Sequence, residues 1–218
     1  MAAAPYSSYR LKLLQNSQGV KNWYTISTWS MFESAYMAGA DLVQSGTLTA
    51  SGQYSAQAPG LAGDGNDGTY WESSDSSALP FAWLRVDLPE AVAVRGLVIK
   101  SLGSMNERPK SFVLQGLDGG EWVDLATHTD AFTTSGPGTF QALIGFGVAG
   151  LSTLEHGEQS SRILAHDWAS GELIRSVVPS HDGSYLIAVD SMAPLLITHT
   201  GPPGYRPVCD GPVQPEEL

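Results

Sequence analysis

Short apolar runs, separated by turn-forming residues, follow one another along most of the chain. Residues 83–88 alternate between apolar and polar positions, and residues 92–99 are rich in the β-branched residues Val and Ile. The run at residues 112–115 leads into Asp118-Gly119-Gly120, which is typical of a hairpin turn, before a further run at residues 122–125. Runs of this length and spacing predict an all-β sandwich or barrel.

One stretch near the N-terminus fits two structures. Ser30 and Glu33 have the spacing of a helix capping box, and Met31 and Phe32 could face a core from such a helix. Residues 24–29, however, enter the same stretch with β-forming residues. We favour a strand up to about Glu33, followed by a loop.

The apolar pattern weakens between residues 145 and 159, where glycine, serine and charged residues predominate. Short runs then resume, and we expect strands at residues 162–166, 173–178, 184–189, 195–199 and 205–208. The predicted domains are a first sandwich over residues 6–145, a linker over residues 146–160, a smaller β-sandwich over residues 161–213 and a tail over residues 214–218. A second domain this short is only marginally stable alone, and we therefore expect it to pack against a neighbouring domain or chain.

Composition narrows the classes of partner. The 218 residues carry 11 basic and 22 acidic side chains, a net charge of −11, and the basic residues are scattered singly. Nucleic acids and anionic membrane surfaces are bound by clustered Lys and Arg, so we expect neither as a partner. We also expect no membrane insertion, because no apolar stretch approaches the ~20 residues that a spanning helix needs.

The cysteine content and the N-terminal sequence favour folding in a cytoplasm. Cys209 is the single cysteine, so an intrachain disulfide is impossible. The first five residues contain no basic segment and begin no apolar stretch of signal-peptide length.

Residues 64–73, DGNDGTYWES, resemble the D-G-x-x-x-T-x-W-x-S segment of discoidin domains. This galactose-binding-like superfamily includes coagulation-factor C domains and many carbohydrate-binding modules. The segments that follow keep the family's order, at residues 82–88, 94–99, 109–115 and 118–125. The resemblance implies an eight-stranded jelly roll with loops gathered at one end.

A narrower resemblance is to discoidin-like modules of tailed-phage virion proteins. Tyr9-Arg10-Leu11 and residues 26–33 are similar to the opening strands of those modules. Residues 170–174, 181–185 and 204–208 resemble segments of a small carboxypeptidase-regulatory or Cna-B-type sandwich. This resemblance implies a virion location, a homo-oligomer and other virion proteins as partners.

The discoidin resemblance also implies a structural calcium ion in the glycine-rich loop. Asp64, Asn66, Asp67 and Thr69 would supply oxygen ligands, which calcium prefers. The alternative is a polar turn, because Asp and Asn side chains bond their own backbone.

Aromatic and polar residues in the expected loops are candidates for glycan binding. Tyr54, Asn106 and Arg108 are the main candidates, and Trp23 and Tyr24 are further ones. The alternative is an exposed loop without a ligand. Three tryptophans match core positions of the family, and we expect them in the core: Trp71, Trp83 and Trp122.

No motif of a catalytic site is evident. The five histidines lack metal-ligand spacing, and no nucleophile elbow or phosphate-binding glycine loop is present. We therefore expect a non-enzymatic protein, and the resemblance to tailed-phage modules implies a structural or attachment component of a virion, in the tail or tail tip. The alternatives are a carbohydrate-binding module for a host surface glycan and an accessory domain of a larger hydrolase.

Overall fold

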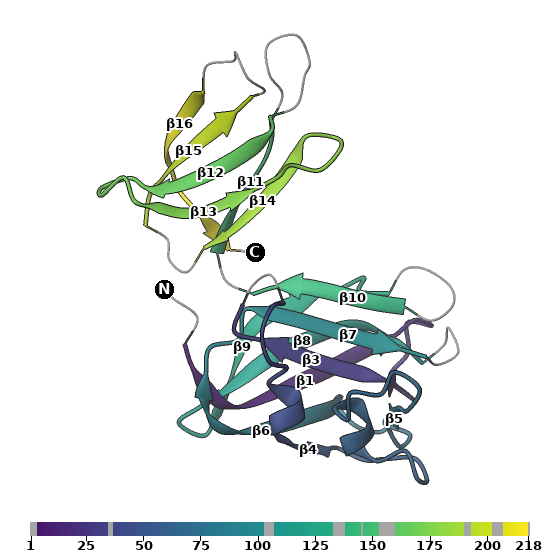
Figure 1. Cartoon of the computed structure of the whole chain (residues 1–218). Helices are drawn as coiled ribbons and strands as arrows, with labels where there is room; N and C mark the ends of the chain where they lie inside the picture. Colours follow the sequence, from purple (N-terminus) through teal and green to yellow (C-terminus); the bar gives the residue numbers. More distant parts are fainter. Residues whose placement is uncertain are drawn as a thin grey trace. The chain divides into compact units, whose positions relative to one another are not determined.

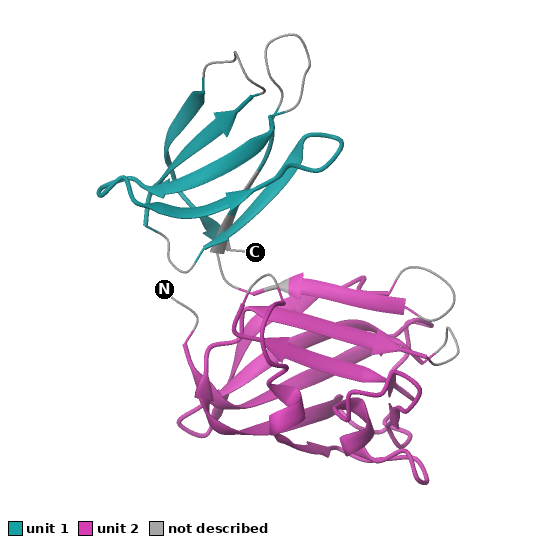
Figure 2. Cartoon of the chain, in the orientation of Figure 1, with its two compact units in different colours: residues 1–3, 145–218 teal, residues 4–144 magenta. Residues whose placement is uncertain are grey.

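A computed structural model describes residues 4–34, 37–102, 107–132, 138–144, 146–152, 160–189, 193–201 and 207–217. The chain divides into two compact units (Figures 1 and 2). The N-terminal unit comprises residues 4–144, and the C-terminal unit comprises residues 145–218 together with residues 1–3.

Strands make up nearly all regular structure of the N-terminal unit, with two short 3-10 turns, η1 and η2. Their bounds are β1 Tyr6–Asn16, β2 Thr25–Ile26, β3 Thr28–Phe32, η1 Val43–Ser45, β4 Thr47–Ala50, η2 Pro59–Ala62, β5 Trp71–Glu72, β6 Ala82–Val92, β7 Gly96–Ser101, β8 Pro109–Asp118, β9 Glu121–His128 and β10 Gly138–Leu143. A five-stranded sheet has the order β4-β6-β1-β8-β9, a three-stranded sheet has the order β10-β7-β3, and β2 pairs with β5. One hydrophobic cluster joins the two main sheets, so the unit is a β-sandwich (Figure 1). The all-β prediction is confirmed.

The alternating sequence of β1 explains how one face of the five-stranded sheet becomes core. Tyr9, Leu11 and Leu13 are fully buried, whereas Arg10 and Lys12 point to the other face. Successive side chains of a strand point to opposite faces, so this period of two places one set of residues in the core. β6 follows the same rule, with buried residues at every second position from Ala82 to Leu88.

The three tryptophans expected in the core have different positions. Trp71 is fully buried, and its indole N–H donates to the Gly52 carbonyl at 3.0 Å, which confirms that prediction. The prediction is wrong for Trp83 and Trp122, which are half-buried. Trp83 occupies an outward position of β6, and Trp122 lies against a cation, with Arg10 Cζ 4.2 Å from the ring centroid.

Two other local predictions are confirmed. β8 and β9 form a hairpin in which Asp118 pairs with Glu121, and the intervening Gly119 and Gly120 have φ values of 56° and 96°. That left-handed conformation suits glycine, because it lacks a Cβ. The stretch ending near Glu33 is a strand, β3, paired with β7.

The C-terminal unit contains two further sheets, of order β14-β11-β17 and β13-β12-β15-β16. The strands are β11 Phe146–Leu151, β12 Arg162–Asp167, β13 Leu173–Val177, β14 Ser184–Val189, β15 Leu195–Thr200, β16 Val208–Val213 and β17 Glu216–Glu217. Its buried apolar cluster is small and aliphatic: Val148, Ile163, Ala165, Ile187, Val189, Leu195 and Ile197.

Three sequence predictions in this unit are wrong. Residues 146–151 are not linker, because they form β11 between β14 and β17. Residues 214–218 are not simply a frayed tail, since β17 pairs with β11. The last long strand is β16 rather than residues 205–208, of which residues 205–206 lie outside the described residues. The linker was predicted from the glycines of this stretch, but Gly150 has a packing role within a strand. A Cβ at Gly150 would lie 2.8 Å from the Tyr185 hydroxyl oxygen, so glycine there makes room for that ring.

Candidate functional site

Four backbone segments of the N-terminal unit lie side by side around β2 and β5, and they contain Tyr54, Glu72, Thr25 and Glu107. Thr25 pairs with Glu72 across these two strands. On one side, the Tyr54 amide donates to the Glu72 carbonyl at 2.8 Å, and on the other, the Thr25 amide donates to the Glu107 carbonyl at 2.8 Å. Backbone bonds therefore fix the order Tyr54, Glu72, Thr25, Glu107 across this small layer.

Two aromatic side chains meet on this layer. The rings of Trp23 and Tyr54 pack edge to face, with centroids 5.1 Å apart and an interplanar angle of 87°. Tyr54 is 50% exposed, and Trp23 is half-buried. Ser55, which follows Tyr54, has a φ of 50°, a left-handed conformation that is costly for a non-glycine residue and is found at functional sites.

Two half-buried carboxylates flank Thr25. The Thr25 hydroxyl donates to Glu107 Oε2 at 3.4 Å. Burial raises the pKa of Glu72 above its ordinary value, and the nearby negative charge of Glu107 raises it further. We call these five residues, Trp23, Thr25, Tyr54, Glu72 and Glu107, the aromatic–carboxylate cluster.

The cluster has the chemistry of a carbohydrate site. Exposed aromatic rings offer apolar surface to the C–H face of a sugar, and carboxylates accept hydrogen bonds from its hydroxyl groups. Binding sites of this kind combine apolar surface with a few placed polar groups. The arrangement supports recognition of a ligand and presents no activated nucleophile.

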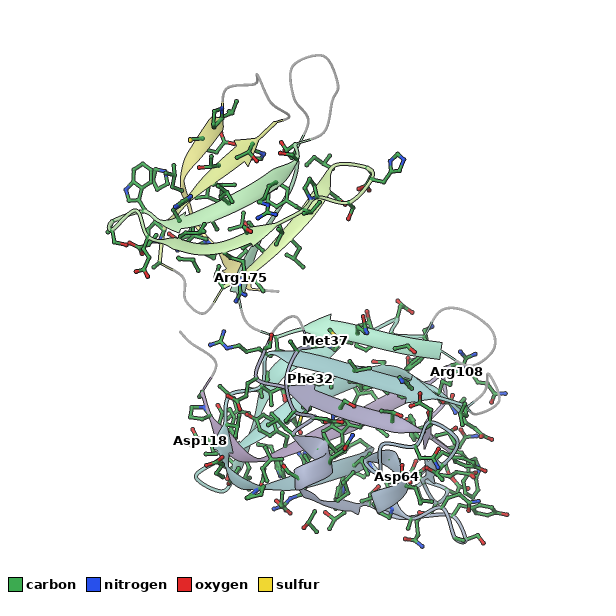
Figure 3. All side chains as sticks on the ribbon, viewed as in Figure 1. Phe32, Met37, Asp64, Arg108, Asp118 and Arg175 are labelled. Carbon is green, nitrogen blue, oxygen red and sulfur yellow. The ribbon has the colours of Figure 1, made fainter. Side chains whose placement is uncertain are left out.

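The structure brings only part of the predicted glycan site together. Tyr54 belongs to the cluster, and Asn106 lies outside the described residues. Arg108, expected on an exposed loop, is only 1% exposed, with its Cζ 5.9 Å from the Phe132 ring centroid. Tyr24 is likewise fully buried. Figure 3 shows Arg108 and Asp118 at opposite ends of this unit, because Arg108 directly precedes β8 and Asp118 is its last residue.

The carboxylates of the cluster could not be identified from sequence motifs. Glu72 and Glu107 are distant along the chain and become neighbours only because β2 lies between them. Glu107 stands in the sequence between Asn106 and Arg108, the two predicted candidates.

The glycine-rich loop forms a self-contained polar turn. Asp64 Oδ1 accepts from the Asn66 amide at 2.8 Å, and Asp64 Oδ2 accepts from the Thr69 hydroxyl at 2.7 Å. Asn66 Oδ1 in turn accepts from the Gly68 amide at 3.0 Å. These bonds are those of the polar-turn alternative.

Asp67, the fourth candidate calcium ligand, faces a cationic side chain. Lys100 Nζ lies 2.6 Å from Asp67 Oδ2, and the Thr28 hydroxyl donates to Oδ1 at 2.6 Å. The bond from Lys100, followed by that from Thr28, lowers the pKa of Asp67. The carboxylates are therefore engaged within the protein, and the arrangement fits a polar turn better than a calcium site.

Calcium binding to this loop stays a prediction, which thermal denaturation with added calcium and with EDTA tests. Among the described residues, no three His, Cys, Asp or Glu side chains gather closely enough to hold a metal ion.

A shallow pocket of about 220 Å³ lies beside the Lys100–Asp67 ion pair. It is lined by Ser27, Asp67, Lys100, Ser101, Leu102, Gly138 and Thr139. The Ser27 hydroxyl is buried without a hydrogen-bond partner.

In the C-terminal unit, a serine, a histidine and an aspartate come together without any motif to predict it. Ser152 Oγ is hydrogen-bonded to Ser160 Oγ and lies 2.6 Å from His199 Nδ1, while His199 Nε2 lies 3.4 Å from Asp210 Oδ2. A serine-hydrolase triad has the opposite order, with serine at Nε2 and the carboxylate at Nδ1. Ser152 is only 2% exposed, so we interpret this array as a buried polar network that ties strands together.

Comparisons with known proteins bear on the N-terminal unit. A search of curated proteins found no match. None of the described helices is long and apolar enough to span a membrane. The family model named F5/8 type C domain matches residues 47–142, from β4 into β10. Such domains, also called discoidin domains, are binding modules rather than catalytic domains. The resemblance inferred from the sequence is thus confirmed for this region, and residues 47–142 match the F5/8 type C, or discoidin, domain family.

Proposed function

We propose that the protein is a carbohydrate-binding protein whose aromatic–carboxylate cluster recognises a surface glycan. The observation that carries this proposal is the packing of Trp23 against half-exposed Tyr54 on a layer whose backbone hydrogen bonds also hold the half-buried residues Glu72 and Glu107. The discoidin match at residues 47–142 supports it, because that family is compatible with carbohydrate or surface binding.

In this proposal the aromatic and acidic side chains have different roles in binding the glycan. The Trp23 and Tyr54 rings contact the apolar face of a sugar, which contributes affinity. Glu72 and Glu107 accept hydrogen bonds from hydroxyl groups, which sets orientation. The backbone bonds that join these segments hold the groups in place before the ligand arrives, which reduces the entropic cost of binding.

A glycan array probed with the full chain tests the proposal. We expect a saturable glycan ligand, and we expect Trp23→Ala and Tyr54→Ala each to weaken its binding by about tenfold or more, since a stacked aromatic contributes of that order. The matched control is Trp168→Ala in the C-terminal unit, which removes an aromatic side chain of similar exposure, 49%. Unchanged binding in folded Trp23→Ala and Tyr54→Ala variants would refute this site.

A second candidate function is a structural or attachment component of a tailed-phage virion, in which the C-terminal unit docks on other virion proteins or on copies of itself. The exposed apolar side chains of that unit favour it, notably Leu151 and Val178, which are about 70% exposed (71% and 70%). Light scattering on the purified chain separates the two candidates. An oligomer supports assembly, and a monodisperse monomer with a saturable sugar ligand argues against it.

A further inference from the structure

The aromatic–carboxylate cluster carries negative charge without a compensating cation. Among the described residues, the ion pairs of the N-terminal unit join Lys100 to Asp67, Arg85 to Asp87 and Lys110 to Asp130. Neither Glu72 nor Glu107 takes part in one, although both are half-buried. A half-buried carboxylate without a cationic partner is energetically costly, and two neighbouring ones repel each other.

The cations that are nearest in sequence do not neutralise this pair. Arg108 follows Glu107, but its guanidinium is buried beside Phe132. Lys21 Nζ points to the Pro80 carbonyl oxygen, 3.5 Å away. The positive charge that the pair lacks is therefore not supplied by either side chain.

The same layer is rich in hydrogen-bond acceptors. The Gln57 carbonyl accepts from the Glu72 amide at 3.4 Å, and the Gln57 side-chain oxygen is buried without a partner. Two carboxylates and one amide oxygen thus have capacity to accept hydrogen bonds. A ligand that complements them is rich in donors, and a cationic donor gains most because charge-assisted hydrogen bonds are the stronger ones.

We infer that the ligand brings this positive charge itself, as an amine-bearing saccharide such as a 2-amino sugar. This inference rests on the carbohydrate-binding function proposed above. The ammonium group lies between the carboxylates of Glu72 and Glu107, and the Trp23 ring offers it a further cation–π contact. The same charge excludes acidic sugars, whose carboxylates would be repelled.

The test is a binding titration of the full chain with methyl glycosides of galactose and glucose in three forms: 2-amino, 2-acetamido and uronic acid. We expect the amino form to bind about tenfold more tightly than the acetamido form, the difference between a charge-assisted and a neutral hydrogen bond, and the uronic form to bind weakest. Equal affinity for amino and acetamido forms overturns the inference and leaves carbohydrate binding intact. Binding of none of the forms overturns both.

Charge-removing variants locate the effect. Glu72→Gln and Glu107→Gln keep the shape of the side chain, and we expect each to reduce the preference for the amino form while binding of the acetamido form persists. The matched control, Glu121→Gln, removes an exposed carboxylate at the β8–β9 hairpin and leaves the preference unchanged. A preference that survives in both cluster variants, folded by circular dichroism, overturns the inference.

The pH dependence of the unmodified chain gives a second readout. The pKa of Glu72 is raised above its ordinary value of 4.5, so this group takes up its proton at a higher pH than an ordinary glutamate. An amine is held by the ionised form, so the preference falls as the pH is lowered towards that raised pKa. A preference that stays constant through this range contradicts the role of Glu72.

Discussion

The two units of the molecule are both all-β, but they bury very different cores. The N-terminal unit buries large aromatic side chains, among them Trp29, Trp71 and Phe112, between its sheets. The described core of the C-terminal unit consists of aliphatic residues only. Burial of apolar surface is the main stabilising contribution to folding, so the N-terminal unit has the larger reserve of stability.

The exposed surfaces differ in the opposite sense. Seven of the twelve large hydrophobic side chains that are exposed among the described residues lie in the smaller C-terminal unit, including Trp168, Leu173 and Val208. A unit that buries little apolar surface and exposes much is suited to association. The comparison therefore fits the two proposals, in which the N-terminal unit recognises a ligand and the C-terminal unit contacts other proteins.

The largest expected effect tests the aromatic core of the N-terminal unit. We expect Trp71→Ala to lower the free energy of unfolding by about 3–5 kcal/mol, because it empties a large buried site and leaves the Gly52 carbonyl without its indole donor. Urea denaturation gives the total loss, and hydrogen exchange shows which unit loses protection. A loss of protection in the C-terminal unit alone would contradict the comparison.

In the C-terminal unit, a smaller loss in the free energy of unfolding should expose more of the unit to hydrogen exchange. Ile197→Ala removes a side chain that is 1% exposed from the small aliphatic core, at a typical cost of about 2–5 kcal/mol. We expect the amides of β12 and β15 to lose hydrogen-exchange protection while those of β1 keep theirs. Retained protection in β12 and β15 would show that this unit is more stable than its core suggests.

The smallest effect sharpens the distinction between core and surface within the N-terminal unit. Trp122 lies half-buried against Arg10 on the outer face of the sheet, so we expect Trp122→Ala to cost only about 1–2 kcal/mol, from a lost cation–π contact and partial burial. Parallel urea curves for this variant and Trp71→Ala measure the difference. Equal losses would place Trp122 among the core residues.

Much of the N-terminal fold could be predicted because its determinants are local. Alternation in β6 and the two glycines of the β8–β9 hairpin specify strands and a turn within a few residues. Trp122 shows the limit of such reasoning. Its environment depends on Arg10, which is distant in sequence and is brought close by the pairing of β1 with β8.

The candidate site was less predictable for the same reason. Tyr54 and Trp23 could be proposed from their residue types. Their packing against each other, and the presence of Glu72 and Glu107 on the same layer, depend on contacts between separate loops and strands. Arg108 shows the converse error. A charged residue in a predicted loop is expected to be exposed, whereas the Arg108 side chain is buried beside the Phe132 ring.

The bond between Ser152 and Ser160 makes the chain between them a natural insertion point. The two hydroxyls are hydrogen-bonded, the Ser152 amide donates to the Gly183 carbonyl, and the Ser161 amide donates to the Thr200 carbonyl. Ser152 and Ser160 are thus held side by side, next to backbone hydrogen bonds that join this part of the chain to the rest of the C-terminal unit. Lengthening a closed loop costs little, because the entropy of closure grows only with the logarithm of its length. We therefore expect a peptide inserted between these serines to cost the C-terminal unit little stability.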